Sequence, residues 1–291
     1  MAKFVPDIKT TRWVVISSQR NDRPDEFSET EKDKPKGCPF CYGNEHLTPN
    51  EVYRVGGEGG ENKTGWIVRV IPNKFPITDT HEVIIHSPNC DTSLEALPVE
   101  HVEQILRTYR QRYQTHAADG QVMIFCNSGA HAGASIKHPH AQLVVIPRQI
   151  NLDALEKEPF NNMISEDEHF SIYCPDFSQW PYEVWITPKT VDKTYGEVTD
   201  EELHALAPSL KNILSTLSKI FDSLKPQDHS AVHSQAKSFA YNFYLYHKEN
   251  WYLRIIPRLV HRAGFELGTG LSVNIIDPDN AAAEIKKLLN G

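Results

Sequence analysis

Apolar positions along this chain follow two patterns, short runs and longer stretches with a spacing of three or four residues. The short runs are rich in β-branched and aromatic residues and predict strands in the first half, at residues 12–18, 66–72, 82–86, 122–126 and 143–147. The stretch from 98 to 118 is amphipathic and predicts a helix. Its apolar stripe consists of Val102, Ile105, Leu106, Tyr109 and Tyr113.

The second half, from about residue 165, repeats this alternation. Thr199 and Glu202 have the spacing of a capping box, which predicts the start of a long helix. The apolar stripe of that helix consists of Leu203, Leu206, Leu210, Ile213, Leu217, Ile220, Phe221 and Leu224. Strands are predicted at residues 180–186, 239–246 and 251–256.

Both halves end their last strand on the same three residues. These are Ile146-Pro147-Arg148 in the first half and Ile256-Pro257-Arg258 in the second. Each half runs helix, strand, strand, Ile-Pro-Arg, so we infer an internal duplication of an α+β unit. We expect two domains, residues 1–164 and 165–291.

Polar residues gather at the start of one predicted strand, in the segment His138-Pro139-His140-Ala141-Gln142. Side chains in a strand alternate between faces, so His138, His140 and Gln142 share one face. Burying two imidazoles and an amide is costly unless they have partners. The segment therefore predicts a catalytic or metal-binding edge. The alternative is a polar strand edge with incidental histidines.

The duplication does not repeat these polar residues. When the two Ile-Pro-Arg endings are matched, Lys248, Asn250 and Tyr252 fall at the positions of the two histidines and the glutamine. We therefore expect the first half to carry the chemistry. The second half would support it or contribute to a partner surface.

Cys38 and Cys41 form a C-x-x-C pair in a segment rich in turn residues, which is typical of a zinc knuckle. A tetrahedral zinc needs two more ligands. Either both histidines of the polar segment bind a metal, or His138 binds it and His140 reacts, or the site only binds a ligand. The candidates for the last metal ligand are Cys90, His81, His86 and His131, and spacing alone does not choose among them.

If His138 binds the metal ion, His140 is available as a nucleophile. A neutral imidazole attacks phosphorus near pH 7 and leaves again from the phosphoramidate. Gln142 can donate an amide hydrogen to a phosphate oxygen, and because it is not an acid it suits transfer between substrates. A third histidine at this position could supply a proton and favour hydrolysis.

Two other polar segments have the composition of phosphate-binding loops. Arg20 and Arg23 lie in a loop, where they are either solvated or form a phosphate clamp. Residues 127–135 are rich in Gly, Ala and Ser, so their backbone N–H groups can approach a ligand closely.

The overall composition narrows the class of protein. The net charge of the 291 residues is −8, with acidic and basic residues mixed along the chain, which argues against a nucleic-acid-binding protein. No apolar run has the length of a signal peptide or a membrane span. We therefore expect no membrane association and a cytoplasmic location, in which the five cysteines would not form structural disulfides.

Taken together, these segments resemble the galactose-1-phosphate uridylyltransferase branch of the histidine-triad superfamily. The resemblance rests on the polar segment 138–142, preceded by Asn127 and Ser135, and covers nearly the whole chain. The other similar segments, in the same order, are Cys38-Pro39-Phe40-Cys41-Tyr42-Gly43-Asn44-Glu45, Pro72-Asn73-Lys74-Phe75-Pro76, Trp180-Pro181 and Gly264-Phe265-Glu266. It implies an α+β fold of two histidine-triad-like halves, with an antiparallel sheet and helices.

The resemblance also implies a reaction in two displacements. His140 attacks the α-phosphorus of a nucleotide sugar, and a second phosphate-bearing substrate then attacks the nucleotidyl-histidine. Gln142 completes the catalytic pair. The implied substrate-binding residues are Arg20, Arg23, Asn73, Phe75, Asn127, Ser135, Phe265 and Glu266. The implied ligands of a structural zinc are Cys38, Cys41, Cys90 and His138.

The predicted activity is that of a UDP-glucose:hexose-1-phosphate uridylyltransferase acting as a homodimer, in which Phe265 and Glu266 reach the partner's sugar site. The alternatives are an ADP-glucose phosphorylase, a nucleotidyl hydrolase and a non-catalytic nucleotide-binding protein. Two departures from the family pattern bear on this. Some family members have a second H-x-H motif, which this chain replaces with Asn250-Trp251-Tyr252, so we expect no second metal. The glutamine that selects the hexose, after Gly-Phe-Glu in the family, is missing here.

Overall fold

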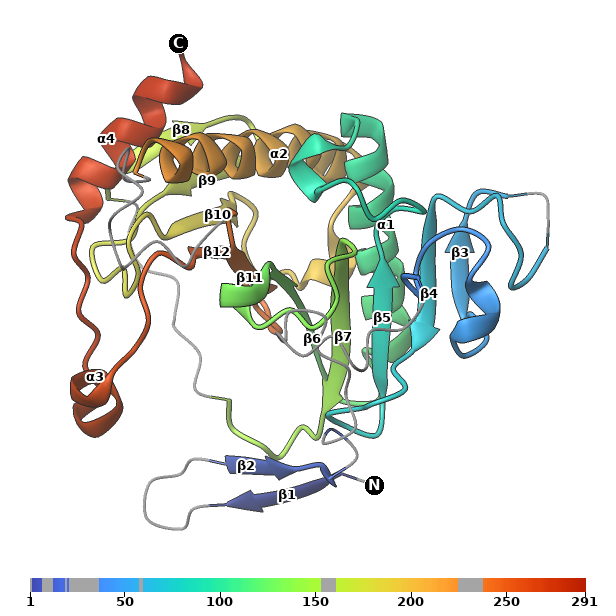
Figure 1. Ribbon diagram of the computed structural model, residues 1–291. Helices are drawn as coiled ribbons and strands as arrows, with labels where there is room; N and C mark the ends of the chain where they lie inside the picture. The colour runs from blue at the N-terminus through green and yellow to red at the C-terminus, as the bar shows by residue number, and fades with distance from the viewer. Residues whose placement is uncertain are drawn as a thin grey trace.

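A computed structural model describes residues 2–6, 13–18, 20, 37–57, 60–152, 161–224 and 238–291. Its centre is a ten-stranded sheet with the strand order β3-β4-β5-β7-β6-β11-β12-β10-β9-β8. All neighbouring strands in it are antiparallel. Helices cover one face of this sheet (Figure 1). The predicted α+β class with an antiparallel sheet is confirmed.

The first half contributes five strands and one long helix. The strands are β3 (Tyr53–Val55), β4 (Val68–Pro72), β5 (His81–Ile85), β6 (Gln121–Ser128) and β7 (His140–Ile146), and helix α1 (Val99–His116) lies between β5 and β6. Four of these strands and the helix were predicted. Strand β7 begins three residues before the predicted apolar run, so His140 and Gln142 are part of it and His138 precedes it.

The second half repeats this arrangement. It consists of β8 (Met163–Glu166), β9 (Phe170–Tyr173), β10 (Val184–Pro188), α2 (Asp200–Ser223), β11 (Tyr241–Leu245) and β12 (Leu253–Pro257). The order β3-β4-β5-β7-β6 in one half corresponds to β8-β9-β10-β12-β11 in the other, and β6 pairs with β11 where the halves meet. The repeated connectivity agrees with the inferred duplication.

The division into two domains stays a prediction, because one sheet and one core extend through both halves. The predicted boundary between residues 164 and 165 falls inside β8. Since β8 pairs with β9, the whole of this strand goes with the second half.

Helices α1 and α2 pack against each other and against the same face of the sheet (Figure 1). The predicted stripe of α1 is fully buried, and so is that of α2 up to Phe221. Leu224 was wrongly placed in that stripe: it is 50% exposed, because α2 ends at Ser223 and Leu224 caps it. The predicted capping box is present, with the Thr199 side chain accepting from the Glu202 N–H and the Glu202 carboxylate from the Thr199 N–H.

The segment 180–183 was predicted as part of a strand, and this is wrong. These residues form a turn, and β10 starts only at Val184. Tyr182 has a φ of 57°, which a strand does not allow. Its hydroxyl instead donates to Glu284 of helix α4 (Pro278–Leu289), and this contact ties the turn to the C-terminal helix.

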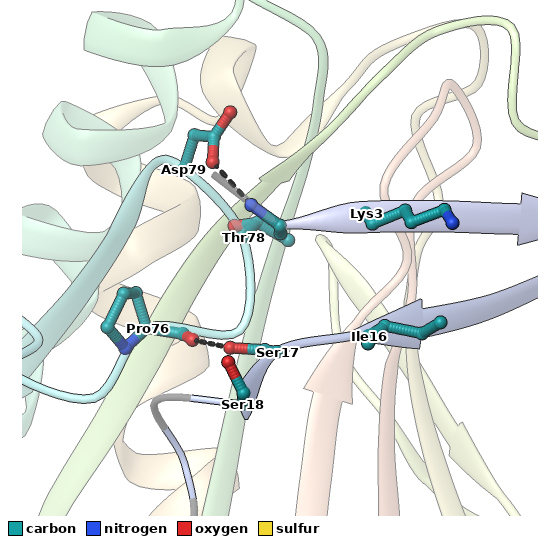
Figure 2. Close-up of a pocket in the computed structure, with 8 residues that line it drawn as sticks. Lys3, Ile16, Ser17, Ser18, Pro76, Thr78 and Asp79 are labelled. Atoms are coloured by element: carbon teal, nitrogen blue, oxygen red, sulfur yellow. Dashed lines mark hydrogen bonds between the residues drawn. The ribbon is translucent and has the colours of Figure 1, made fainter.

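An N-terminal hairpin lies outside the main sheet, formed by β1 (Lys3–Pro6) and β2 (Trp13–Ile16). Figure 2 shows how its base meets the loop after β4: Ser17 Oγ donates to the Pro76 carbonyl over 2.7 Å, and the Ala2 N–H donates to Asp79 over 2.8 Å. A pocket of ≈ 290 Å³ lies between them. The hairpin is thus held against the loop that follows Asn73.

The remaining helices are short. They are α3 (Gly264–Thr269), η3 (Glu45–Leu47), η4 (Leu94–Ala96), η5 (Ala130–Ala132) and η6 (Tyr195–Glu197). Helix α3 projects from the body of the molecule (Figure 1). Among the helices of the described ranges, none combines the length and the apolar character needed to cross a membrane.

Candidate active site and metal centre

The predicted site lies on the sheet face opposite α1 and α2. In β7, His140 pairs with Ile85 of β5 and Gln142 pairs with Val83, and directly paired residues share a face. Val83 and Ile85 belong to a small apolar cluster with Phe40, Trp66 and Ile71. His140 and Gln142 are 6% and 4% exposed, so their polar atoms need specific partners.

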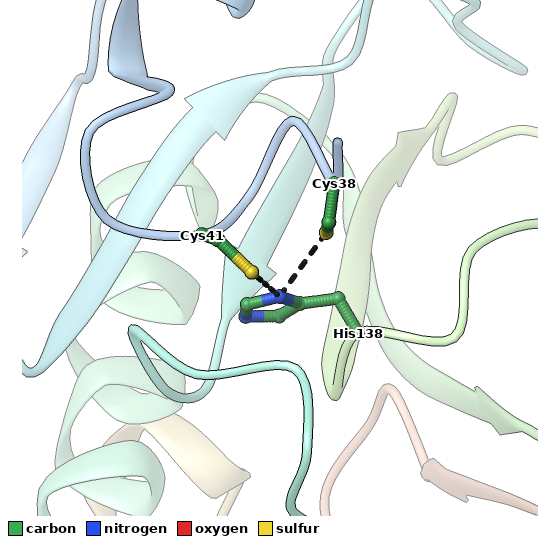
Figure 3. A group of neighbouring side chains, drawn as sticks. All are labelled: Cys38, Cys41 and His138. Carbon is green, nitrogen blue, oxygen red and sulfur yellow. Dashed lines mark hydrogen bonds between the residues drawn. The ribbon is translucent and has the colours of Figure 1, made fainter. Parts of the chain in front are cut away.

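Cys38, Cys41 and His138 come together as the sequence predicts (Figure 3). His138 Nδ1 lies 3.4 Å from the Cys38 Sγ and 3.6 Å from the Cys41 Sγ. Two thiols and one imidazole nitrogen are ligands that zinc prefers. Residues 100 positions apart in the sequence thus form a group that can hold a metal ion.

The His138 ring is oriented for this role by its second nitrogen. Nε2 lies 2.5 Å from the Ser87 carbonyl, which can only accept, so Nε2 carries the proton and Nδ1 keeps its lone pair toward the thiols. Metal-binding histidines are commonly oriented by such a bond. Burial lowers the pKa of His138 to about 4, so the ring is neutral near pH 7, the state that binds metal.

Cys90 is next to this group, and the other three candidates for the last ligand have different partners. The Cys41 thiol hydrogen-bonds with Cys90, and burial raises the pKa of both. His86 contacts the Tyr109 hydroxyl over 2.6 Å and His131 contacts His261 over 3.2 Å. His81 contacts Gln142, as described below. Among the described residues, Cys38, Cys41 and His138 thus form a group that can hold a metal ion. Cys90 hydrogen-bonds with Cys41 but is not part of that group, so its role as the fourth ligand stays a prediction.

His140 has a defined tautomer. Its Nδ1 lies 2.7 Å from the His138 carbonyl oxygen, which fixes the proton on Nδ1 and leaves the lone pair on Nε2. The ring packs edge-on against Phe40, with centroids 5.6 Å apart. This is the arrangement that a nucleophilic imidazole needs, and the same His138 residue links it to the candidate metal centre.

The residues predicted to bind substrate on the β4–β5 loop are close to Gln142. Gln142 Oε1 lies 3.0 Å from His81 Nε2, and Asn73 Nδ2 lies 3.1 Å from the same nitrogen. The Phe75 N–H donates to Asn73 Oδ1 over 2.8 Å. Arg20 reaches this loop from the N-terminal hairpin, with Nη1 3.3 Å from the Phe75 carbonyl. The sequence did not predict the contact between His81 and Gln142.

Arg23 lies outside the described residues, so its predicted role stays a prediction. Ser135 is half-buried in the loop that leads to His138. Phe265 and Glu266 are on α3, apart from β7 within one chain (Figure 1). Phe265 is 55% exposed, and Glu266 accepts from the Ala263 N–H over 3.0 Å.

Asn127 is held by a residue of the second half. Asn242 of β11 donates from Nδ2 to Asn127 Oδ1 and to the Ala132 carbonyl, each over 2.8 Å. It thereby ties the end of β6 to the loop before the polar segment. Gly129 in this loop has a φ of 84°, and a Cβ there would lie 2.9 Å from the Ala240 Cβ, so the close approach of the two halves requires glycine. Asn242 was missed because its partner is distant in sequence.

At the corresponding place in the second half, Tyr252 takes the position of Gln142 and Asn250 that of His140. Tyr252 stacks on Trp185, with ring centroids 4.0 Å apart. Asn250 sits in a turn with a φ of 57° and accepts from the Asp192 N–H. Tyr252 thus contributes to packing and Asn250 to a turn in the half without the histidines.

Known proteins are similar to this chain in sequence and in fold. Residues 76–146 match the family model described as the N-terminal domain of galactose-1-phosphate uridyl transferase. An ADP-glucose phosphorylase from Arabidopsis thaliana is 27% identical over 97% of this chain and 92% of its own length. A galactose-1-phosphate uridylyltransferase from Thermotoga maritima is 26% identical over 96% of each chain.

Solved structures share the fold. The crystal structure of the Arabidopsis thaliana ADP-glucose phosphorylase with bound ADP-glucose aligns with a TM-score of 0.72 at 24% identity, over 99% of both chains. A uridylyltransferase structure aligns with a TM-score of 0.73 at 21% identity, over 100% of this chain and 99% of that one. The resemblance to the galactose-1-phosphate uridylyltransferase family is thus confirmed by a family model, by relatives that match along almost the whole chain and by a shared fold.

Proposed function

We propose that this protein is a nucleotidyltransferase that moves a nucleoside monophosphate from a nucleotide sugar to a second phosphate-bearing substrate. The observation that carries the proposal is the geometry of His140. Its Nδ1 proton is directed to the His138 carbonyl, so Nε2 is the nucleophilic nitrogen, and the Gln142 carboxamide lies on the same strand face. The relatives that match most of the chain are named for reactions of this type.

In the first step, His140 Nε2 attacks the α-phosphorus of the nucleotide sugar. The new N–P bond forms while the bond from the α-phosphorus to the bridging oxygen breaks, and sugar 1-phosphate leaves with that oxygen. The positive charge that develops on the ring is stabilised through Nδ1–H by the His138 carbonyl. Gln142 donates an amide hydrogen to a non-bridging oxygen, where negative charge accumulates.

In the second step, a phosphate oxygen of the acceptor attacks the same phosphorus and the N–P bond breaks. His140 returns to its neutral form without needing an external acid, because protonated imidazole is a good leaving group. Gln142 cannot donate an acidic proton, so the site favours transfer to a phosphate rather than assisted attack by water. This distinguishes the proposal from a hydrolase.

A zinc ion would be held by Cys38, Cys41, Cys90 and His138. A closed tetrahedral zinc with four protein ligands supplies structural cross-linking rather than a reactive position. The ring of His138 faces the thiols while its carbonyl accepts the His140 proton. The knuckle at Cys38 therefore also helps to fix the orientation of the nucleophile.

Two acceptors are compatible with the site. A hexose 1-phosphate would make the protein a uridylyltransferase, which is our sequence-based prediction. Inorganic phosphate would make it an ADP-glucose phosphorylase. The absence of the hexose-selecting glutamine after Glu266 and the similarity to the plant phosphorylase support this second candidate.

A substrate panel separates the two candidates. UDP-glucose and ADP-glucose are each incubated with galactose 1-phosphate and with inorganic phosphate, and the products are quantified by chromatography. ADP formed from ADP-glucose and phosphate supports the phosphorylase. UDP-galactose formed from UDP-glucose supports the uridylyltransferase. Release of nucleoside monophosphate to water in every reaction would instead indicate a hydrolase.

We also propose that two copies of the chain complete the site. Helix α3 projects from the body of the molecule (Figure 1). Its apolar residues Phe265 and Leu267 are exposed, which suits contact with a second copy. Phe265 and Glu266 would then reach the partner's sugar site. We further propose a cytoplasmic location, where the thiols of Cys38, Cys41 and Cys90 stay reduced.

A further inference from the structure

We propose that His81 is a positioning residue that fixes the orientation of the Gln142 carboxamide. The inference rests on the proposed function and deepens it, because it explains which atom of Gln142 faces the phosphate. His81 is the first residue of β5 and only 4% exposed. Both of its ring nitrogens are engaged, and their partners determine where the proton lies.

The His81 tautomer follows from one backbone donor. The Ile77 N–H points at His81 Nδ1 over 2.9 Å. A backbone N–H can only donate, so Nδ1 must accept and the proton of the neutral ring is on Nε2. His81 Nε2–H therefore donates to its acceptor, Gln142 Oε1, over 3.0 Å. Asn73 Nδ2 also lies 3.1 Å from His81 Nε2, but an amide NH₂ group can only donate, so it is not an acceptor for the Nε2 proton. The acceptor atom of Asn73, Oδ1, is bound to the Phe75 N–H instead.

This bond orients the Gln142 side chain. A carboxamide presents either an oxygen or an NH₂ group, and the two orientations are nearly equal in shape. Because His81 can only donate from Nε2, it selects the orientation with the oxygen toward itself. The NH₂ group of Gln142, which makes no hydrogen bond to another described residue, then faces the ligand side. A phosphate oxygen on that side then meets the two N–H donors of the Gln142 amide and not a lone pair of its oxygen.

The second half of the chain provides an internal comparison. His81 pairs with Val144, two residues beyond Gln142, and Trp185 pairs with Arg254, two residues beyond Tyr252. The equivalent pair, Trp185 and Tyr252, is a stack of two aromatic rings. The fold therefore accepts an apolar pair at these positions. The polar pair of His81 and Gln142 occurs in the half that holds His140. This indicates that the pair has a role in the chemistry and not in the packing of the sheet.

A double-mutant cycle tests this role. His81→Leu removes the donor, and His81→Gln restores an amide N–H near the position of Nε2. The rate at which a nucleotide sugar labels His140 is measured for each variant, together with the affinity for the nucleotide sugar. We expect His81→Leu to slow labelling about 10- to 100-fold, as for other orienting partners, and His81→Gln to recover most of the rate.

The Gln142→Ala background shows whether His81 acts through Gln142. In that background, His81→Leu should cause little further loss, because residues that act as one unit are not additive. The proposal would be overturned if His81→Leu slowed labelling equally in the wild-type and Gln142→Ala backgrounds. It would also be overturned if His81→Leu weakened only the affinity for the nucleotide sugar. Thermal stability and zinc content of each variant are measured alongside, so that a folding defect is recognised.

A measurement without substrate separates this inference from the proposed function. Two-dimensional ¹H–¹⁵N spectra of the histidine rings, assigned with His81→Gln, report which nitrogen of His81 is protonated. We expect a proton on Nε2 and none on Nδ1. A proton on Nδ1 would overturn the proposal even if the protein proves to be a transferase. If no nucleotide sugar labels the wild-type protein, the proposed function fails and this spectrum still decides the tautomer.

Discussion

At the scale of single residues, His138 is the link between two parts of the site. Its ring faces two thiols while its carbonyl sets the tautomer of His140. The alternation along a strand predicted only that the two histidines share a face, and their separate roles were implied by the need of Cys38 and Cys41 for further metal ligands and by the family resemblance. The sequence could not predict the backbone bond between them, because that depends on the turn before β7.

Cys90→Ala tests the composition of the metal centre. We expect zinc per chain to fall well below the value for the wild-type protein, because Cys90 hydrogen-bonds with Cys41 beside the three grouped ligands. Zinc is measured by atomic spectroscopy after dialysis. Cys174→Ala is the matched control, since Cys174 is buried in the core of the second half and should leave the zinc content unchanged. Full zinc content in Cys90→Ala would remove this residue from the site.

His247 should make the stability of the fold depend on pH. Burial lowers its pKa to about 4 from an ordinary value near 6.5, and its Nε2 has no hydrogen-bond partner among the described residues. Between these two values the unfolded chain binds more protons than the folded one, so the free energy of unfolding falls as the pH falls from about 6.5 to about 4.

The measurement is urea denaturation across this pH range. His247→Gln, which carries no charge at any pH, should show a shallower loss of stability toward pH 4 than the wild-type protein. Burial lowers the pKa of His138 and His86 as well, so the free energy of unfolding of the variant should still depend on pH to some extent. An identical slope in the variant would show that His247 does not contribute.

At the scale of elements, the hydrophobic pattern predicted most strands and both long helices. It was wrong at the turn 180–183, which was assigned to a strand, and it did not predict the short strands β1, β3, β8 and β9. Contacts between elements were also hidden from the pattern. His81 and Asn242 occupy ordinary strand positions, and only the pairing of β5 with β7 and of β6 with β11 brings them to Gln142 and Asn127.

The capping box of α2 gives a test at this scale. Thr199→Ala removes the side-chain oxygen that accepts from the Glu202 N–H. We expect a loss of about 1 kcal/mol in the free energy of unfolding, measured by urea denaturation at pH 7. Thr199→Ser keeps an acceptor and should lose little. Equal losses in the two variants would indicate that the methyl group matters more than the cap.

At the scale of the whole molecule, the chain is a duplicated α+β unit in which one copy holds the polar site and the other has the stacked pair Trp185 and Tyr252 in place of His81 and Gln142. The Ile-Pro-Arg repeat was enough to predict the duplication. It did not predict that the two copies would share one sheet through β6 and β11, because that joint depends on pairing between residues more than 100 positions apart.

The exposed segment from α3 onward tests the proposed assembly. Leu267 and Leu271 are 76% and 61% exposed, more than expected for leucines without a partner surface. Leu267→Asp combined with Leu271→Asp should halve the mass in solution, measured by light scattering after size exclusion. Val191→Asp is the control, because Val191 is 62% exposed elsewhere in the second half. A wild-type mass of one chain would contradict the assembly.

The central claim is that His140 carries the nucleotidyl group. The protein is incubated with UDP-glucose or ADP-glucose labelled at the α-phosphate, and the label is located by peptide mapping under alkaline conditions. We predict acid-labile label on His140 with at least one of the two, no label in His140→Gly, and unchanged zinc in that variant. The absence of label on the wild-type protein with both nucleotide sugars would show that His140 is not the nucleophile for either of them.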